Sequence, residues 1–197
     1  MIGAHEGGDF ARPCLGSTAR SVVRHAPCSV EIVRPRSSEL AKPGLKILVA
    51  TDGSEFSTAA LRSVAGRPWP NGTEIKVISV PEFILLKEFS YLATHEIEEF
   101  DDLGAASMED AKRCVMAGVE IFSGSGLQVR GEVPEFEERP YQVILHEANQ
   151  WHADLIVLGS HGRGGFDRVM MGSVAEAVAF QAHSSVEIIR RSQTPAD

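Results

Sequence analysis

Two short, unbroken aliphatic runs constrain the fold of this chain most strongly. They are KILVA at residues 46–50 and DLIVLG at residues 154–159. Neither run alternates apolar with polar residues, so neither is typical of a strand with one face in water. Runs of this length indicate strands covered on both faces, as in a parallel sheet between two layers of helices. The sequence therefore predicts a core of parallel strands.

The segments around these runs alternate between strand and helix patterns. Further strands are predicted at 73–80, 127–133 and 184–190, and helices after Ser54, at 91–122, from Pro140 and at 173–182. Ser54 is suited to cap the first of these helices, and Pro140 is suited to begin the third. This order predicts an α/β fold over residues 45–191, with a doubly wound five-stranded parallel sheet in a three-layer sandwich. Residues 192–197 are left as a tail.

An internal repeat accounts for the N-terminal part of the sequence. Shifted by 156 positions, residues 3–34 match residues 159–190 at fifteen of 32 places. Ordinary residue frequencies give about two matches by chance. We therefore expect residues 1–37 to be the loop, helix and last strand of a preceding copy, so that the chain begins inside a domain. Residues 38–44 are expected to be a linker.

A glycine-rich segment, GSHGRGGFDRVMMGS at residues 159–173, follows the second aliphatic run. Gly159 ends the predicted strand, and Gly172 and Ser173 open the next helix. Glycines allow the backbone to approach a ligand, and a helix N-terminus presents free N–H groups that favour anions. A phosphate site and a structural turn both fit this pattern. The segment has neither GxxxxGK[ST] nor GxGxxG, which excludes the two standard nucleotide loops.

An acidic residue, Asp52, follows the first aliphatic run. In doubly wound sheets, ligands bind beyond the carboxyl ends of the strands, where the strand order reverses. If the strands at 46–50 and 154–159 are neighbours, Asp52 and Gly159 face one crevice. Asp52 could then bond a nucleoside or help to hold a metal; it could also form an Asx turn in TDGS.

These motifs resemble the universal stress protein family. The resemblance is carried by KILVATDGSEFSTAAL, DLIVLGSHGRGG and GSVAEAVAFQAHSSVEIIR. The family's nucleotide motif is Gly, two residues, Gly, nine residues, Gly, then Ser or Thr, and Gly159, Gly162, Gly172 and Ser173 match it without a gap. The resemblance implies a sheet in the order 3-2-1-4-5 and ATP, with or without Mg²⁺, as the ligand.

The resemblance also implies a role for each matching position. The residues expected near the nucleoside are Ala50, Asp52 and Ser79, the last through its backbone. The residues expected around the ribose and α-phosphate are Gly159, His161 and Gly162. The residues expected to hold the outer phosphates are Gly172, Ser173 and Val174. The segment 81–91, which could cover the adenine, is peculiar to this chain.

The N-terminal copy is expected to need a host, because a lone loop, helix and strand cannot bury its own apolar face. The resemblance implies that family dimers and tandem pairs join through their last strands. We therefore expect strands 29–34 and 184–190 to pair antiparallel, in a homodimer or in an intramolecular pseudo-dimer. The first copy is not expected to bind phosphate, because Glu6 replaces the second motif glycine.

Other candidate residues carry weaker signals. His161 could be read as a catalytic base, but no Ser or Cys nucleophile with a partner acid accompanies it, so no catalytic residue is predicted. Arg163 and Arg168 fit either phosphate pairing or solvated loop positions. The segment LHEANQWH lacks the HExxH spacing, so no metal site is predicted. Cys114 is expected to be a small packed residue within a helix.

Composition excludes several classes of protein. The net charge of −8 argues against a general nucleic-acid binder. No apolar run approaches 18 residues, so no membrane span is predicted. The three cysteines form no CxxC pair, and their odd number fits reduced thiols in the cytoplasm.

Three functions remain open from the sequence. The first is an ATP-binding universal stress protein, a nucleotide-dependent stress-response or signalling module. The second is a slow ATPase or nucleotide hydrolase, and the third is an interaction protein without a nucleotide. The first is favoured because the glycine motif is complete and no general base stands out.

Overall fold

The computed structural model describes residues 2–3, 15–35, 43–81, 97–135, 138–164 and 171–190. The domain is built, in chain order, from β3 (Lys46–Ala50), α2 (Glu55–Ala65), β4 (Glu74–Ile78), α4 (Ile97–Glu120), β5 (Gln128–Glu132), α5 (Pro140–Trp151), β6 (Leu155–Gly159), α6 (Ser173–Gln181) and β7 (Ser185–Ile189). The N-terminal copy contributes β1 (Ile2–Gly3), α1 (Ser17–His25) and β2 (Val30–Val33). The predicted alternation of strands and helices is confirmed.

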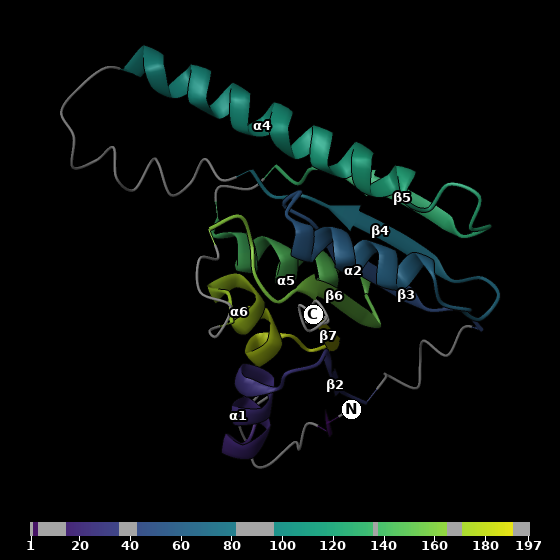
Figure 1. Ribbon diagram of the computed structural model, residues 1–197. Helices are drawn as coiled ribbons and strands as arrows, with labels where there is room; N and C mark the ends of the chain where they lie inside the picture. The colour runs from purple at the N-terminus through teal and green to yellow at the C-terminus, as the bar shows by residue number, and fades with distance from the viewer. Residues whose placement is uncertain are drawn as a thin grey trace, which may run out of the picture.

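The strands form one sheet with helices on both faces (Figure 1). Its order is β1-β2-β7-β6-β3-β4-β5. The five strands of the domain are parallel and, counted along the chain, lie in the predicted order 3-2-1-4-5. The prediction was incomplete at one edge, where β1 and β2 extend the sheet to seven strands. The carboxyl ends of β3 and β6 are thereby neighbours, as the predicted crevice requires.

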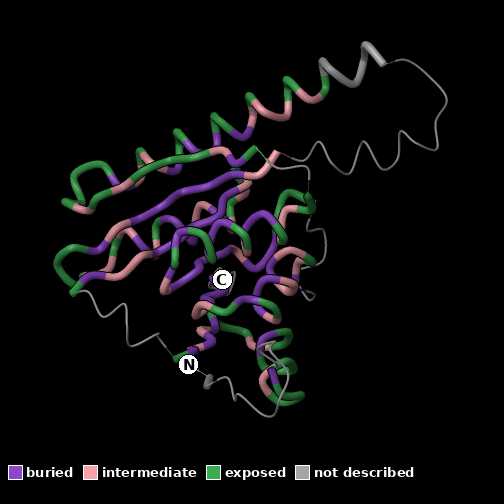
Figure 2. Tube along the Cα trace, turned by 180° about the vertical axis from the view of Figure 1, so that it is seen from behind, coloured by how far each residue is buried: buried purple, intermediate pink, exposed green. Residues whose placement is uncertain are grey.

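Two apolar layers explain why the aliphatic runs do not alternate with polar residues. In β3, Ile47 and Val49 pack with α2, whereas Leu48 and Ala50 pack on the opposite face with α5 and α6. Each strand residue is therefore buried whichever way it points. Figure 2 shows the buried residues concentrated along these central strands. At the edge of the sheet, Val23 of α1 joins the layer formed by α5 and α6.

The helix ends follow the expected local chemistry. The Ser54 hydroxyl accepts a hydrogen bond from the Ser57 amide at 3.2 Å and caps α2, as predicted. Pro140 is the first residue of α5, also as predicted. The long helix α4 runs unbroken from Ile97 to Glu120, and residues 91–96 of the predicted helix lie outside the described part of the chain.

The N-terminal copy repeats the geometry of the domain. β1 pairs with β2 in parallel, and Ile2 faces Ile32 as Leu158 faces Ile188 in the β6–β7 pair. β2 then pairs antiparallel with β7 of the same chain. The predicted antiparallel pairing of the two last strands is therefore confirmed, in its intramolecular form. This pairing covers the edge that β7 would otherwise expose.

A buried ion pair lies within the apolar sheet. The Lys76 ammonium in β4 lies 2.6 Å from a Glu147 carboxylate oxygen of α5 and 2.8 Å from a Glu132 oxygen of β5. Its side chain is 6% exposed and that of Glu147 is 9% exposed, whereas Glu132 is 47% exposed. The Trp151 ring also lies near the ammonium, with its centroid 5.8 Å away. Lys76 is thus held in a largely dry site by Glu147.

Candidate functional site

A cavity of about 490 Å³ opens at the carboxyl ends of β3 and β6 and at the N-terminus of α6. Eight of the nine predicted site residues line it, namely Ala50, Asp52, Gly159, His161, Gly162, Gly172, Ser173 and Val174. The ninth, Ser79, is buried just after β4 and is not a lining residue, whereas its neighbour Val80 is. The role predicted for the Ser79 backbone stays a prediction.

The N-terminus of α6 forms one wall of the cavity. Gly172 is the N-cap residue and has no side chain to bond the helix amides. Its own N–H donates to the Ser160 carbonyl at 2.8 Å, and its carbonyl accepts from Glu176 N at 2.9 Å. The amides of residues 173–175 precede that bond and have no acceptor within the helix. These three amides, named here the amide cradle, present free donors at the positive end of the helix dipole, an arrangement that favours anions.

The Ser173 hydroxyl is available to the cavity. The sequence left two roles open for it, helix cap or phosphate ligand. In the structure Ser173 is the first residue of α6 rather than its cap, and it is exposed. The capping role therefore does not apply. The hydroxyl lies at the rim of the cavity that Gly172 and Val174 also line.

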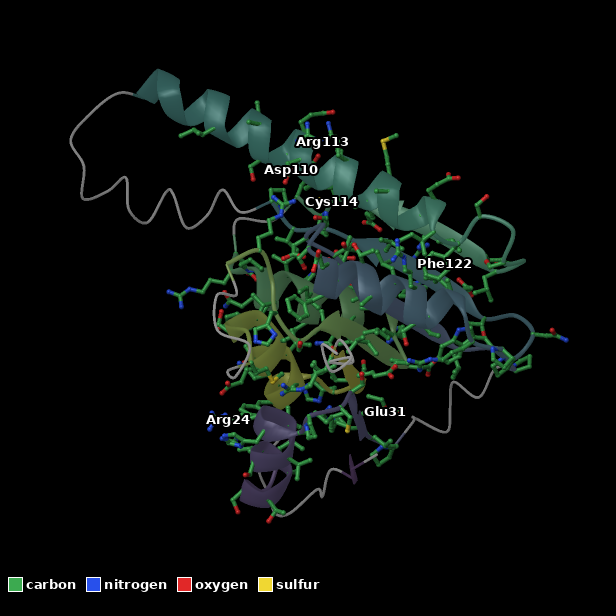
Figure 3. All side chains as sticks on the ribbon, in the orientation of Figure 1. Arg24, Glu31, Asp110, Arg113, Cys114 and Phe122 are labelled. Atoms are coloured by element: carbon green, nitrogen blue, oxygen red, sulfur yellow. The ribbon has the colours of Figure 1, made fainter. Side chains whose placement is uncertain are left out.

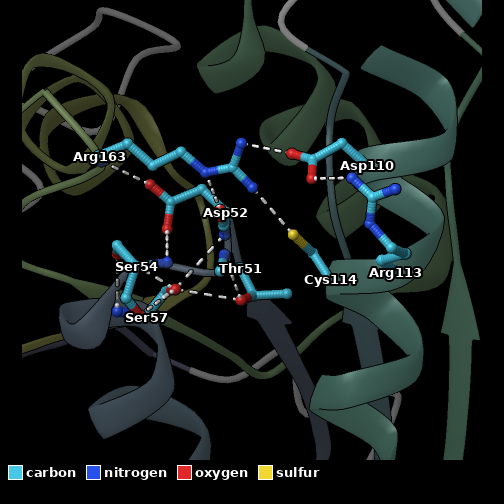
Figure 4. A network of polar contacts seen from close by, with 9 residues as sticks. Thr51, Asp52, Ser54, Ser57, Asp110, Arg113, Cys114 and Arg163 are labelled. Carbon is cyan, nitrogen blue, oxygen red and sulfur yellow. Dashed lines mark hydrogen bonds and ion pairs between the residues drawn. The ribbon is translucent and has the colours of Figure 1, made fainter. Parts of the chain in front are cut away.

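Asp52 holds the glycine loop against the start of α2 (Figure 4). One carboxylate oxygen accepts from the Ser54 amide and the other from the Arg163 amide, each at 3.0 Å. The first bond is the Asx turn that one interpretation predicted. Asp52 also lines the cavity, and its role toward a nucleoside or a metal stays a prediction. Burial alone would raise the pKa of Asp52, but hydrogen bonds from Ser54, Ser57 and Arg163 together lower it.

The lowered pKa predicts that Asp52 contributes to stability in a pH-dependent way. A carboxylate with a depressed pKa stabilises the fold above its unfolded pKa, and this contribution is lost as the pH falls through the folded value. We expect the stability difference between wild type and Asp52→Asn to be full at pH 6–7 and to shrink below about pH 4. Urea unfolding at several pH values measures it. A difference that stays constant down to pH 3 would contradict this role.

At Gly159 and Gly162 neighbouring atoms approach the backbone too closely to leave room for a side chain. A Cβ built at Gly159 would lie 2.6 Å from the Phe56 carbonyl carbon and 2.8 Å from the Ser57 amide nitrogen. A Cβ at Gly162 would lie 2.7 Å from the Asp52 carboxylate. The first contact lets β6 end against α2. The second lets the loop close over Asp52, so both motif glycines shape the cavity.

His161 is packed into the structure. It is 7% exposed, and its ring lies 4.9 Å from the Phe56 ring, measured between centroids. Its Nδ1 lies 3.0 Å from the Ser160 hydroxyl. The side chain therefore forms part of the cavity wall, with a neighbour that fixes its orientation.

Arg163 is an exposed loop residue that lines the cavity, and its pairing with phosphate stays a prediction. Its guanidinium extends from the loop toward α4, where it bonds Asp110 and donates to Cys114 Sγ at 3.0 Å (Figure 4). It also donates to the Asp52 carbonyl. The loop is therefore tied both to the end of β3 and to α4. Cys114 is buried as expected, but it also accepts this bond. Arg168 lies outside the described residues.

Metal and membrane features are absent from the described residues. They contain no group of three or more His, Cys, Asp or Glu side chains that could hold a metal ion. The helices resolved there include none with the length and apolar character to cross a membrane.

The comparison with family models identifies the chain. The model described as the universal stress protein family matches residues 45–190. The chain belongs to the universal stress protein family. The match covers the whole domain from β3 to the end of β7.

Relatives and solved structures of the family agree with this fold. A universal stress protein of Mycobacterium tuberculosis is 27% identical over 198 residues, covering 98% of this chain and 61% of that protein. The chain therefore spans about three-fifths of the length of this relative. The structure of UspA from Lactobacillus plantarum has a TM-score of 0.59 and 23% identity, covering 76% of this chain and 99% of the other. A universal stress protein of Archaeoglobus fulgidus in complex with dAMP has a TM-score of 0.51 and 22% identity, covering 76% and 100%.

The universal stress motif did not reveal the apolar wall of the cavity. This wall is formed by Val80, Pro140, Ile144, Leu158 and Met171. Pro140 and Ile144 are four residues apart on α5 and share one face of that helix. Sequence spacing could have indicated this face, but not that it meets the ends of β4 and β6.

Proposed function

We propose that this universal stress protein binds ATP in the cavity and acts as a nucleotide-dependent stress-response or signalling module. One observation carries the proposal: the free amides at the start of α6 line the same cavity as Asp52 and the apolar wall. A polyphosphate fits the amide cradle, and a purine fits the apolar wall. A volume of about 490 Å³ lies within the range of small-molecule sites.

The family comparison supports an adenine nucleotide as the ligand class. The structure of the Archaeoglobus fulgidus universal stress protein, which has the same fold, is that of a complex with dAMP. The matched motif, with Gly159, Gly162, Gly172 and Ser173 all lining the cavity, extends the proposal to a triphosphate. Mg²⁺ is usually held by substrate phosphates and one or two carboxylates, so Asp52 is the cavity residue that would hold any Mg²⁺ bound with ATP.

Binding without rapid turnover is the form of the proposal that the contacts favour. Both Asp52 oxygens accept backbone N–H groups, and His161 is packed against Phe56. A general base works best with a pKa near the working pH, and the hydrogen bonds to Asp52 lower its pKa, which makes this carboxylate a weak base. Slow hydrolysis remains the second candidate, and steady release of phosphate by the purified protein would favour it.

The exposed thiol of Cys28 and the buried thiol of Cys114 are consistent with action in the cytoplasm.

Calorimetric titration with ATP tests this proposal. Ser173→Ala removes one hydroxyl from the cradle and leaves the three amides, so we expect about tenfold weaker ATP binding. Ser123→Ala is the matched control, because Ser123 is exposed in the turn after α4, away from the cavity residues. Equal affinities of both variants would remove Ser173 from the site. No binding by the folded wild type at millimolar ATP would overturn the proposed function.

A further inference from the structure

The interface between the N-terminal copy and the domain has approximate two-fold symmetry. Glu31 of β2 pairs with Glu187 of β7, which is its own counterpart at a shift of 156 residues. On one side of this pair Val30 faces Ile188, and on the other Ile32 faces Val186. Each contact between equivalent positions is thus made twice, as in an interface between two identical subunits.

Side-chain bonds at the two strand ends follow the same symmetry. The Arg34 amide donates to the Ser185 hydroxyl at 3.1 Å, and the Arg190 amide donates to the Ser29 hydroxyl at 3.0 Å. Each arginine also donates through Nη2 to a backbone carbonyl of the opposite helix at 2.9 Å, α6 for Arg34 and α1 for Arg190. The backbone pairing and these terminal bonds therefore do not distinguish one copy from the other. At the centre the copies differ, because Arg67 of the domain donates to both carboxylate oxygens of Glu187.

The helices α1 and α6 differ at six of their nine equivalent positions, and two of these positions carry charged contacts across the interface. At the shift of 156 residues, Arg20 of α1 corresponds to Glu176 of α6. One helical turn later, Arg24 corresponds to Phe180. Arg24 Nε lies 3.1 Å from a Glu176 carboxylate oxygen. The Arg20 and Arg24 guanidinium carbons lie 4.9 and 5.4 Å from the Phe180 ring centroid. Figure 3 shows Arg24 at the side of α1 toward α6.

The Arg24–Glu176 and Arg20–Phe180 contacts are attractive only between unlike copies. Two N-terminal copies paired in the same way would set arginine against arginine at every one of these contacts. Two complete domains would set Glu176 against Phe180, with no cation for the carboxylate, and Phe180 against Phe180. Like charges at such spacing repel, whereas Arg–Glu and Arg–aromatic contacts attract. Only the mixed pair gives both Glu176 and Phe180 a cation.

We propose that the α6–β7 edge of the domain is a heterotypic docking site, one that takes an unlike copy of its own motif. Glu176 and Phe180 recognise a basic helix followed by an SVEI-type strand. In this chain the occupant is the segment 15–35, which presents Arg20 and Arg24. The same pair of positions disfavours docking of a second complete domain on this edge.

A double-mutant cycle in the full chain tests the recognition. Arg24→Glu and Glu176→Arg each place like charges together, so each should speed amide exchange in β2 (Val30–Val33) by about fivefold. The double variant restores an ion pair of reversed sign, and its exchange should return to within about twofold of wild type. Arg62→Glu is the matched control, since Arg62 is exposed on α2 away from this interface. Simple addition of the two single effects, or no effect of either, would overturn the proposal.

Disulfide cross-linking at position 187, which lies at the centre of the two-fold pairing, tests the selectivity for an unlike copy. Directly paired residues of antiparallel strands lie at a Cα distance that a disulfide can span. The native cysteines are changed to serine, and Glu187→Cys then cross-links two chains only when two complete domains pair through β7. We expect little cross-linked dimer in this background and several-fold more after Arg20→Glu with Arg24→Phe, which makes the two copies alike. Equal cross-linking with and without Arg20→Glu and Arg24→Phe would overturn the proposed selectivity. Strong cross-linking of the Glu187→Cys variant that keeps Arg20 and Arg24 would overturn it too.

Discussion

Replacing Gly162 by alanine is expected to weaken ATP binding about 30-fold while leaving the protein folded. The new Cβ would lie 2.7 Å from the Asp52 carboxylate, closer than such contacts allow. The carboxylate and the loop must therefore move apart. Because Asp52 accepts the Arg163 amide at 3.0 Å, the shift breaks the bond that holds the loop over the cavity. Loss of this bond, and of one hydrogen bond between the displaced loop and the nucleotide, at about 1 kcal/mol each corresponds to this change in affinity.

Gly164→Ala is the matched control for this prediction. Gly164 lies in the same loop and lines the same cavity, but a Cβ built there meets no atom within 4 Å. Calorimetry should therefore give the Gly164→Ala variant the affinity of wild type. If the two variants bind ATP equally, the closure of the loop over Asp52 does not position the nucleotide. Circular dichroism melting of both variants separates loss of binding from loss of the fold.

Replacing Glu147 by alanine is expected to destabilise the protein by about 3 kcal/mol. The substitution leaves the Lys76 ammonium, 6% exposed, without its buried partner and beside only the half-exposed Glu132. An uncompensated buried charge is among the costliest defects in a protein interior. In a domain of this size the expected drop in Tm is about 10 °C. Thermal and urea unfolding measure it.

Two further variants show whether charge is the cause. Glu138→Ala removes an exposed carboxylate just before α5, and its stability should stay within about 0.5 kcal/mol of wild type. The double variant Lys76→Met with Glu147→Leu removes both charges and should recover most of the loss, because apolar replacements of a buried pair are often neutral. A double variant as unstable as Glu147→Ala would show that packing, and not the unpaired charge, is responsible.

The elements that could be predicted from sequence are those with a local or repeated signal. The unbroken runs of β3 and β6 indicated burial on both faces, and the two cores of the sheet explain why. The near-identity of 29–34 and 184–190 predicted the antiparallel edge pairing, because the same apolar pattern must be covered in both copies. The order of the strands required the family resemblance, since sequence spacing alone does not fix which parallel strands are neighbours.

The features that could not be predicted are contacts between distant segments. Arg163 bonds Asp110 and Cys114 on α4, about fifty residues earlier, and no periodicity in the loop indicates that partner. Lys76 and Glu147 are 71 residues apart and meet only because α5 crosses the sheet beside β4. The site was predicted better than these contacts, because its glycines and Asp52 follow strand ends that the topology brings together.

The central claim is that the cavity between β3, β6 and α6 holds ATP. Mass analysis of the small molecules released when the freshly purified protein is denatured tests it most directly. The account predicts ATP in the released fraction of wild type and a large reduction for Gly162→Ala prepared in parallel. Folded wild-type protein that releases no adenine nucleotide, and takes none up when ATP is added, would contradict it.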